Sequence, residues 1–349
     1  MHLNKCYEQL FLCFAVFSYE GSSQYTQNIY CCRLPSGTNI EDVQTSIKNK
    51  ERSSACATCW KLEDQGLESE RKIHNRTFDY YADRDLELVE HDAITNGFTP
   101  KIIKLTTSNL CNATCITCGT HSSTAWAKLE NRPIKYAIAN TTGINFKDIV
   151  QLSFVGGEPL LEKRNFDILE ELISLENTSC FISIVTNGSI ELSQRQLNVL
   201  SQFKNLNICL SIDGIGNQFN YIRWPLTWDQ LQYNLAQFKH ITQHISVSCM
   251  ISNLNVFYYS DLIDFFEANQ LKYLCKQIVD PAHFAPGNLP DQFKQQVLKN
   301  NKRYHNEVSA FLSYGGGLIE KFWKEIDRQD QLKGTDIKNY LPELAATRI

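Results

Sequence analysis

Short runs of β-branched and other apolar residues recur between residues 101 and 280, and segments with a helical pattern separate them. Each run is long enough for one strand. Six strands are predicted in this way, at 102–106, 150–155, 181–185, 208–212, 245–251 and 271–279. The chain from residue 101 onward is therefore predicted to build a sheet.

Two of the intervening segments carry the apolar stripe of a helix that covers a sheet. One stripe runs from Phe166 to Ile173 and the other from Tyr259 to Phe266. Alternating strands and helices, joined by right-handed crossovers, build a parallel sheet. Six such units are fewer than the eight of a closed barrel. The sequence therefore predicts an α/β fold, a partial (β/α)6 barrel, in which chemistry gathers at the carboxyl ends of the strands.

The segments on either side do not share this rhythm. Residues 1–100 hold a second group of clustered cysteines and end in a polar connector at 83–99. Residues 286–349 are predicted to be a helical extension, which three glycines interrupt at 315–317. We therefore expect three parts: a cysteine-rich module, a core over residues 101–285 and a helical C-terminal extension.

One apolar run near the start, Leu10 to Phe17, has the length of a short signal-peptide core. It has no clear small-residue cleavage site, and it is far below the roughly 20 apolar residues that a membrane span needs. We interpret it as a buried strand, so neither a membrane anchor nor a signal peptide is expected.

The charge and the cysteine content narrow the classes of function. The 349-residue chain has a net charge of -4 and a pI near 6.1, so it offers no general attraction to nucleic acid or to an anionic membrane. A local basic patch is still compatible with these values. Its 13 cysteines are clustered, and clustered cysteines in a long chain more often hold metal than form disulfides. A reducing cytoplasm is the expected location.

Three of the cysteines lie close together just after the first predicted strand. Cys111, Cys115 and Cys118 are spaced four and then three positions apart in one loop. A structural zinc takes four ligands, and a cubane iron–sulfur cluster is normally held by four thiolates. A loop with three thiolates therefore needs a distant fourth ligand, or it leaves one iron open for a substrate or cofactor.

Turn motifs follow the next three strands. The second strand runs into Gly156-Gly157-Glu158-Pro159, where the glycines permit close backbone approach and a carboxylate precedes a proline-started helix. The third and fourth strands run into the turns at 186–189 and 211–214. Their Asn-Gly and Asp-Gly dipeptides are common in turns, so each motif alone is most simply structural. Their order at successive strand ends indicates one shared site.

In this order, the cysteine loop and the turns resemble the radical S-adenosylmethionine (radical SAM) superfamily. The resemblance implies that Cys111, Cys115 and Cys118 hold a [4Fe-4S] cluster with one iron open to S-adenosylmethionine (SAM). It also implies that Glu158 and its turn position the amino-acid end of SAM. The implied chemistry is reductive cleavage of SAM to a 5′-deoxyadenosyl radical, which abstracts hydrogen from a substrate.

The same resemblance assigns further residues at the strand ends. Arg223 would pair with the carboxylate of SAM, although an exposed arginine ahead of a helix is an ordinary surface feature. Asn255 and Pro281 also match the pattern, and a helix cap explains Asn255 equally well. Thr117 departs from the pattern, so the contact to adenine is not assigned. Four residues would border the ribose and methionine of SAM: Thr186, Asn187, Ser211 and Asp213.

The N-terminal cysteines form a second constellation. Cys13, Cys31 or its neighbour Cys32, and the pair Cys56 and Cys59 offer four thiolates, which can close around zinc or a cubane cluster. They resemble the twitch or SPASM-type auxiliary-cluster modules of radical SAM enzymes, which implies a second [4Fe-4S] cluster. Those modules commonly follow the core, whereas this one precedes it. A structural zinc knuckle is the alternative.

The resemblance also implies partners. Enzymes of this subgroup act on peptides or other large substrates, and they take electrons from an external donor such as flavodoxin or ferredoxin. The substrate and the reaction cannot be deduced from the sequence. A rival interpretation is a non-catalytic zinc or iron–sulfur module that contacts a protein or a nucleic acid. It would need basic patches interleaved with aromatic residues, and the basic residues around 48–52 and 71–72 are sparse.

Overall fold

The structure is a computed structural model of the chain, and it describes only part of the N-terminal third. The described residues are 17–20, 38–66, 101–136, 141 and 144–348, together with 69, 71, 72, 75, 91 and 95. The side chains of 17–20 and of residue 40 are not described. Residues 10–16 of the first apolar run and the cysteines at 6, 13, 31 and 32 lie outside this part.

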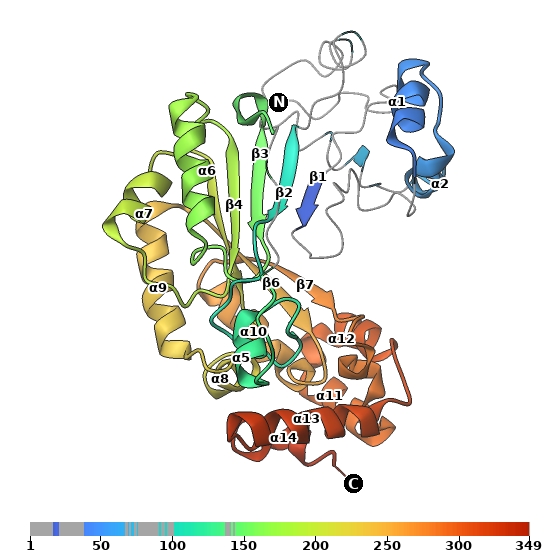
Figure 1. Cartoon of the computed structure of the whole chain (residues 1–349). Helices are drawn as coiled ribbons and strands as arrows, with labels where there is room; N and C mark the ends of the chain where they lie inside the picture. The colour runs from blue at the N-terminus through green and yellow to red at the C-terminus, as the bar shows by residue number, and fades with distance from the viewer. Residues whose placement is uncertain are drawn as a thin grey trace.

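One parallel sheet runs through the described residues, with its strands in chain order (Figure 1). The strands are β1 Phe17–Glu20, β2 Ile102–Thr106, β3 Gln151–Val155, β4 Phe181–Thr186, β5 Leu206–Ser211, β6 His244–Ile251 and β7 Lys272–Gln277. The last six agree with the six predicted strands to within two residues at each end. β1 begins at the final residue of the apolar run that we interpret as a strand. The α/β fold with an open, partial barrel is confirmed, with seven strands instead of six.

Alternate strand residues face opposite sides of this sheet. Every second residue of β3, β4, β5 and β6 is buried, and the residues between them are only partly covered. The buried set packs beneath the helices that follow the strands and forms the main core. We call the opposite side of β2–β7 the inner face.

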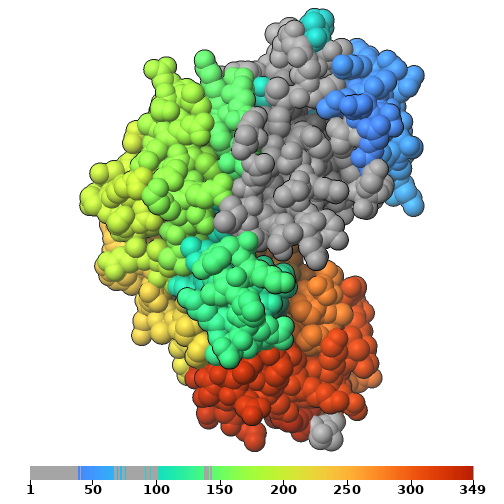
Figure 2. All heavy atoms as spheres, viewed as in Figure 1, coloured from blue at the N-terminus to red at the C-terminus, as the bar shows by residue number. Residues whose placement is uncertain are grey.

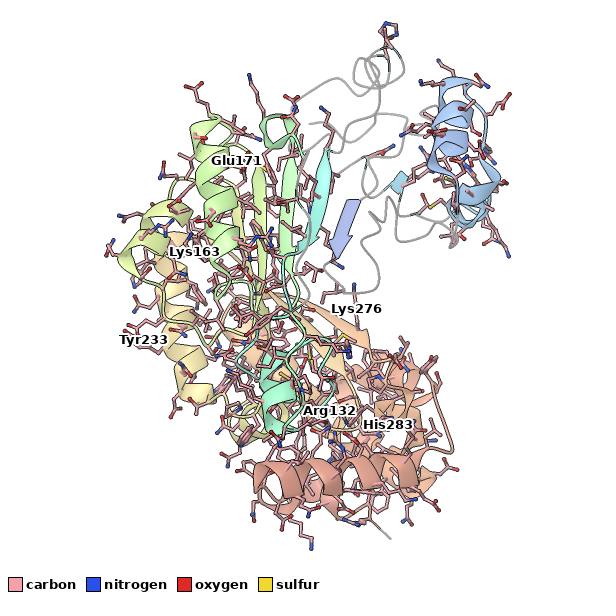
Figure 3. The ribbon with its side chains drawn as sticks, in the orientation of Figure 1. Arg132, Lys163, Glu171, Tyr233, Lys276 and His283 are labelled. Atoms are coloured by element: carbon pink, nitrogen blue, oxygen red, sulfur yellow. The ribbon has the colours of Figure 1, made fainter. Side chains whose placement is uncertain are left out.

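The helices along the sheet are amphipathic, as their stripes predict. They are α6 Lys163–Ser174, α7 Gln194–Leu200, α9 Trp228–Ile241 and α10 Tyr259–Ala268. Phe166 and Leu169 are buried, as are the four apolar residues of the second stripe, from Tyr259 to Phe266. In Figure 1, α6, α7 and α9 lie along one side of the sheet. Lys163, Glu171 and Tyr233, labelled in Figure 3, are exposed residues of α6 and α9. This arrangement leaves the carboxyl ends of the strands free for the connecting loops.

The remaining helices lie at the two ends of the chain and at the strand ends. Two short helices, α5 Thr124–Leu129 and α8 Asn217–Ile222, follow β2 and β5. The N-terminal part contains α1 Ile40–Lys48 and α2 Ala57–Asp64. The C-terminal part contains α11 Asp291–Asn300, α12 His305–Leu312, α13 Ile319–Lys333 and α14 Pro342–Ala345. Residues 315–317 separate α12 from α13, where glycines were expected to break the helix.

The C-terminal helices lie across the carboxyl ends of the strands. Figure 2 shows the segment around α5 packed directly against the red C-terminal helices. Aromatic contacts join the two parts, because Phe322 of α13 meets Phe284, which follows β7, with ring centroids 5.7 Å apart. Among the described helices, none combines the length and the apolar character that a bilayer crossing requires.

Candidate active site

The cysteine loop links β2 to α5 and is fixed by backbone hydrogen bonds to a distant segment. The amide of Thr114 donates to the carbonyl of Trp224 over 2.7 Å, and the amide of Ile116 donates to the carbonyl of Ile222 over 2.9 Å. The indole of Trp126 donates to the carbonyl of Cys115 over 3.0 Å. The loop is therefore held in one conformation by its neighbours, and not by its own turn preferences alone.

The three thiols of the loop share one electrostatic environment. A hydrogen bond from Cys118 and the charge of Arg223 outweigh burial and together lower the pKa of the buried Cys115 thiol to about 6. The same bond raises the pKa of Cys118. Burial, together with the charge of Cys115, raises the pKa of Cys111 to about 11. The loop therefore places the three thiols close enough to shift one another's pKa values.

The donor chemistry of the loop bears on which group it could hold. Within the described residues, no three His, Cys, Asp or Glu side chains converge as the ligands of one metal ion do. The thiolates of a cubane cluster bind separate irons, so their sulfurs surround a shared space instead of one point. The donor set, three soft thiolates on one loop, fits an iron–sulfur cluster.

Arg223 lies beside the cysteine loop, and one of its buried nitrogens has no partner within the described part of the chain. Its Nη2 donates to Asp213 Oδ2 over 2.5 Å, and its Nη1 lies 4.0 Å from the sulfur of Cys115. Its side chain is 13% exposed, and its Nε finds no hydrogen-bond partner among the described residues. The interpretation of Arg223 as an ordinary exposed arginine is therefore wrong. A buried, unsatisfied guanidinium N–H is costly unless an anionic group completes the site.

Glu158 ties the ends of two neighbouring strands together. Its side chain is buried, and its Oε1 accepts hydrogen bonds from the Thr186 hydroxyl at 2.7 Å and the Leu160 amide at 3.1 Å. Its Oε2 accepts one from the Asn187 amide at 2.7 Å. Burial raises the pKa of Glu158, and these hydrogen bonds oppose the rise. A carboxylate has about four lone-pair sites, so about one is left for a further donor.

The glycines of this turn let it dock against the cysteine loop. A Cβ at Gly157 would lie 2.3 Å from the carbonyl oxygen of Leu110, and Gly156 has a φ of +112°. The Glu158 amide donates to that same Leu110 carbonyl over 2.7 Å. The first turn motif and the cysteine motif thus pack directly against each other, which explains why the chain contains both.

A polar link that the sequence analysis missed connects the loop to the third strand end. The side chain of Asn187 donates to Asn112 Oδ1 over 2.9 Å, and Asn112 Nδ2 donates to the Ser189 hydroxyl over 2.8 Å. Asn112 directly follows Cys111, which is the only signal in the sequence that could have pointed to it. Asn187 therefore holds the loop in addition to any contact with a cofactor.

The ends of β5 and β6 are also locked together. The Asp213 carboxylate accepts from the amide of Met250 over 2.8 Å. Asn255 is fully buried and donates to the carbonyl of Asp213 over 3.0 Å and to that of Met250 over 2.8 Å. It occupies the N-cap position of the helical turn that follows, but its side chain makes no cap hydrogen bond there and joins the strand ends instead. Ser211 ends β5 and is half-buried on the inner face. Asp213 and its partner Arg223 are thus held in place by the hydrogen bonds that join these two strand ends.

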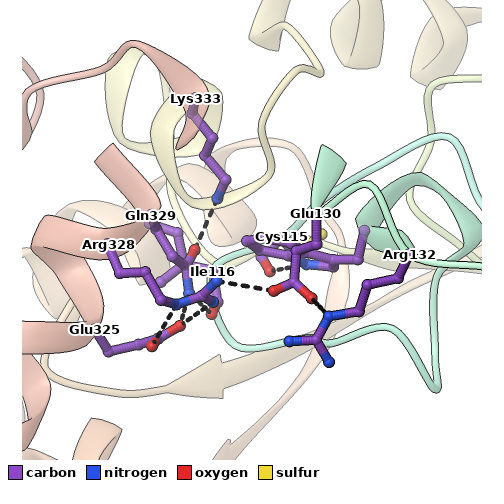
Figure 4. Close-up of polar contacts among 9 residues, drawn as sticks. Cys115, Ile116, Glu130, Arg132, Glu325, Arg328, Gln329 and Lys333 are labelled. Atoms are coloured by element: carbon purple, nitrogen blue, oxygen red, sulfur yellow. Dashed lines mark hydrogen bonds and ion pairs between the residues drawn. The ribbon is translucent and has the colours of Figure 1, made fainter. Parts of the chain in front are cut away.

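The C-terminal extension adds a second set of residues that the sequence analysis missed. Gln329 of α13 donates from its side chain to the carbonyl of Ile116 over 2.9 Å, and Arg328 reaches Glu130 over 2.8 Å (Figure 4). Burial lowers the pKa of the neighbouring Lys333 to about 8. No local sequence signal connects α13 to a loop more than 200 positions earlier.

The inner face of the sheet is polar and carries cations. Strands β2–β7 contain no Asp or Glu, and most of their inner positions carry polar side chains, with Ser and Lys the commonest. Lys104, Lys272 and Lys276 are exposed there, and none forms an ion pair with a described residue. The ammonium of Lys276, labelled in Figure 3, lies close enough to Cys209 on β5 to lower its pKa, although burial makes the net shift upward.

The N-terminal part contains a compact polar group around α2. Cys56 ends a short helical turn and Cys59 is buried, whereas Cys13 and Cys31 lie outside the described residues. Glu63 forms an ion pair with Arg71 at 2.6 Å, and the guanidinium of Arg71 lies 4.5 Å above the ring of Trp60. The structure therefore neither assembles nor separates the four predicted ligands of the second cluster.

Comparisons with known proteins return solved structures only; no protein-family model and no curated protein matches this sequence. Native anSMEcpe with bound AdoMet is 20% identical over 58% of this chain and 58% of that chain, with a TM-score of 0.43. Streptococcus suis SuiB bound to precursor peptide SuiA is 11% identical over 75% and 62%, also with a TM-score of 0.43. SuiB bound to S-adenosylmethionine is 16% identical over 77% and 60%, with a TM-score of 0.41. The match takes in about three fifths of each of those chains.

Proposed function

We propose that this chain is a radical SAM enzyme that cleaves SAM at a [4Fe-4S] cluster held by Cys111, Cys115 and Cys118 and abstracts hydrogen from a substrate. One observation carries the proposal. Three thiols lie near one another at the carboxyl ends of parallel strands, beside Arg223, whose buried Nε has no hydrogen-bond partner among the described residues. When bound, the cluster and SAM supply the radical chemistry, and the protein supplies binding and orientation.

The residues at the carboxyl ends of the strands divide the binding of SAM among them. Arg223 offers its free N–H to the carboxylate of SAM, and Asp213 holds the guanidinium in place. Glu158 and its turn, Gly156 to Pro159, position the amino-acid end of SAM. The hydrogen bonds of Glu158 with Thr186 and Asn187 hold the ends of β3 and β4 together. Ser211 borders the ribose and methionine from the end of β5.

The substrate enters over the inner face, and we propose that it is a peptide with acidic side chains. The cations Lys104, Lys272 and Lys276 face this space, and no acidic residue of β2–β7 opposes them. Leu274 lies between two of the lysines on β7 and is 54% exposed, so an apolar side chain also finds a contact there. An anionic, partly apolar segment of a peptide matches both features.

The other expectations complete the proposal. Residues 1–100 form a twitch-like module in which Cys13, Cys31, Cys56 and Cys59 hold a second [4Fe-4S] cluster. Residues 101–285 form the radical SAM core, and residues 286–349 form the helical extension. An external donor such as flavodoxin or ferredoxin supplies the electron, and the cytoplasm keeps the thiols reduced.

Anaerobic reconstitution of the full chain with iron and sulfide tests the proposal. We expect about eight irons per chain, about four from each cluster, and 5′-deoxyadenosine when SAM and dithionite are added. Cys118→Ala should abolish 5′-deoxyadenosine and lower the iron to about four, whereas Cys59→Ala should lower the iron and keep the cleavage of SAM. Cys180→Ala changes a buried core cysteine and serves as the matched control. Stoichiometric zinc without cleavage of SAM would instead indicate a non-catalytic module.

A further inference from the structure

Lys333, the last residue of α13, is a buried cation that forms no ion pair with a carboxylate among the described residues. It is 8% exposed, and its Nζ donates to Gln329 Oε1 over 2.8 Å. The ammonium also lies 4.7 Å from the ring centroid of Trp126. Both partners are neutral. A buried ammonium is costly unless a negative charge lies near it.

The carboxylates near Lys333 are already bonded to other groups. Asp330 accepts from the hydroxyls of Tyr221 at 3.0 Å and Thr335 at 2.6 Å, and from the amide of Ile337 at 3.0 Å. Glu325 accepts from Arg328 at 2.6 Å, and Arg328 itself adds a second cation near Lys333.

Glu325 also accepts from Gln329 at 2.8 Å. The remaining charged neighbour of Lys333 is Cys115, whose thiolate attracts the ammonium. The negative charge around Lys333 therefore comes from Cys115 of the cysteine loop as well as from Asp330 and Glu325 of its own helix.

The position of Lys333 relative to the loop is fixed by a chain of contacts. Gln329 accepts from Lys333 and donates to the carbonyl of Ile116, so a single side chain joins the cation to the loop (Figure 4). Trp126 lies under Lys333 and donates to the carbonyl of Cys115. The ion pair of Arg328 with Glu130 fastens the same helix to the end of α5.

We propose that Lys333 is a positioning residue which places a fixed positive charge beside the cluster at Cys111, Cys115 and Cys118 and raises its reduction potential. The inference rests on the proposed function, because it requires a cluster at these cysteines. Reduction adds negative charge to the cluster, and a nearby cation stabilises the reduced form. Because Lys333 is buried, water and salt screen this effect only weakly.

The test is a redox titration of the reconstituted full chain, followed by electron paramagnetic resonance. Lys333→Met and Lys333→Gln remove the charge, and both should lower the ratio of reduced to oxidised cluster at a given potential about tenfold, a shift of about 59 mV for a one-electron couple. Lys324→Met removes an exposed lysine from the same helix and should leave the midpoint unchanged. Lys333→Arg keeps the charge and should stay near the wild type.

The outcomes separate this inference from the proposed function. If the wild type forms no cluster, the proposed function and this inference fall together. If the cluster forms and the neutral variants titrate as the wild type does, only the inference is overturned. A shift in Lys333→Arg as large as in Lys333→Met also overturns it, because the effect would then come from packing. If both neutral variants lose the cluster and Lys333→Arg retains it, the cluster needs a positive charge at this position in order to assemble, which supports the inference.

Discussion

At the scale of single residues, the site depends on how closely two backbones approach. Gly157 is where the turn after β3 meets the cysteine loop, and a Cβ there would overlap the carbonyl oxygen of Leu110 at 2.3 Å. The obstacle is backbone and cannot rotate away as a side chain would. The same glycine also donates its amide to the carbonyl of Ser108 over 3.1 Å. The residue therefore decides whether the two motifs can dock.

Gly157→Ala should lower the free energy of unfolding by about 1–3 kcal/mol and reduce the iron content after reconstitution, because the turn must move away from the loop. Urea unfolding of the purified chain measures the first effect. Gly119→Ala is a matched control in the same loop, since its Cβ would meet only the ring of His121, at 3.3 Å. Equal losses in the two variants would contradict the docking argument.

Another prediction at this scale concerns the buried pair of Asp213 and Arg223. Asp213→Asn keeps the shape but leaves the guanidinium without its counter-charge, and such a loss costs about 3–5 kcal/mol of stability. Arg223→Gln in the same chain should recover part of that loss, because the uncompensated charge disappears. A double-mutant cycle from urea unfolding measures the coupling between the two side chains. Strictly additive effects would show that the pair does not interact.

At the scale of elements, the helix α2 carries a buried ion pair near its carboxyl end. Burial raises the pKa of Glu63, but the hydrogen bonds from Arg71 and Ser69 outweigh it, so that the pKa falls below its ordinary value of 4.5. Arg71 is itself buried and is held between this carboxylate and the ring of Trp60. A group with a depressed pKa contributes stability above its unfolded pKa and loses it as the pH falls through the folded one.

Glu63→Gln should therefore lower the melting temperature by an amount that is constant from neutral pH to about pH 5.5 and that shrinks at lower pH. The measurement is the difference between wild type and variant across that pH range. Asp64→Asn is the matched control, because its partner Arg52 is exposed and surface pairs contribute little. A difference that is independent of pH down to pH 3 would contradict the argument.

At the scale of the whole molecule, local patterns predict some features and not others. The six core strands and the order of the turn motifs follow from apolar periodicity and turn chemistry, which act over a few residues. The burial of Arg223 does not, because it depends on a segment that folds back onto the cysteine loop. The contact of Gln329 with Ile116 joins residues 213 positions apart, and no periodicity encodes such a pairing. Both misses arise from tertiary packing.

The distribution of charge is a property of the whole molecule as well. The chain is acidic overall, with a net charge of -4, yet β2–β7 carry only cations, and three lysines are exposed on the inner face. Most acidic side chains lie on helices and loops, where many are paired with arginines. A substrate that bears negative charge should therefore be attracted to the inner face and repelled elsewhere.

Replacing Lys104, Lys272 and Lys276 by Gln should weaken the binding of fluorescein-labelled decaglutamate about tenfold at low salt, as fluorescence anisotropy measures, because about 1.4 kcal/mol of attraction is lost. The attraction in the wild type should also fall as salt is added. The control replaces three exposed lysines on outer helices, Lys239, Lys299 and Lys324, and so removes the same net charge. If both triple variants lose affinity equally, the attraction comes from net charge alone, and the inner face is not where an acidic peptide binds. If only the first triple variant loses affinity, the lysines of the inner face select the substrate.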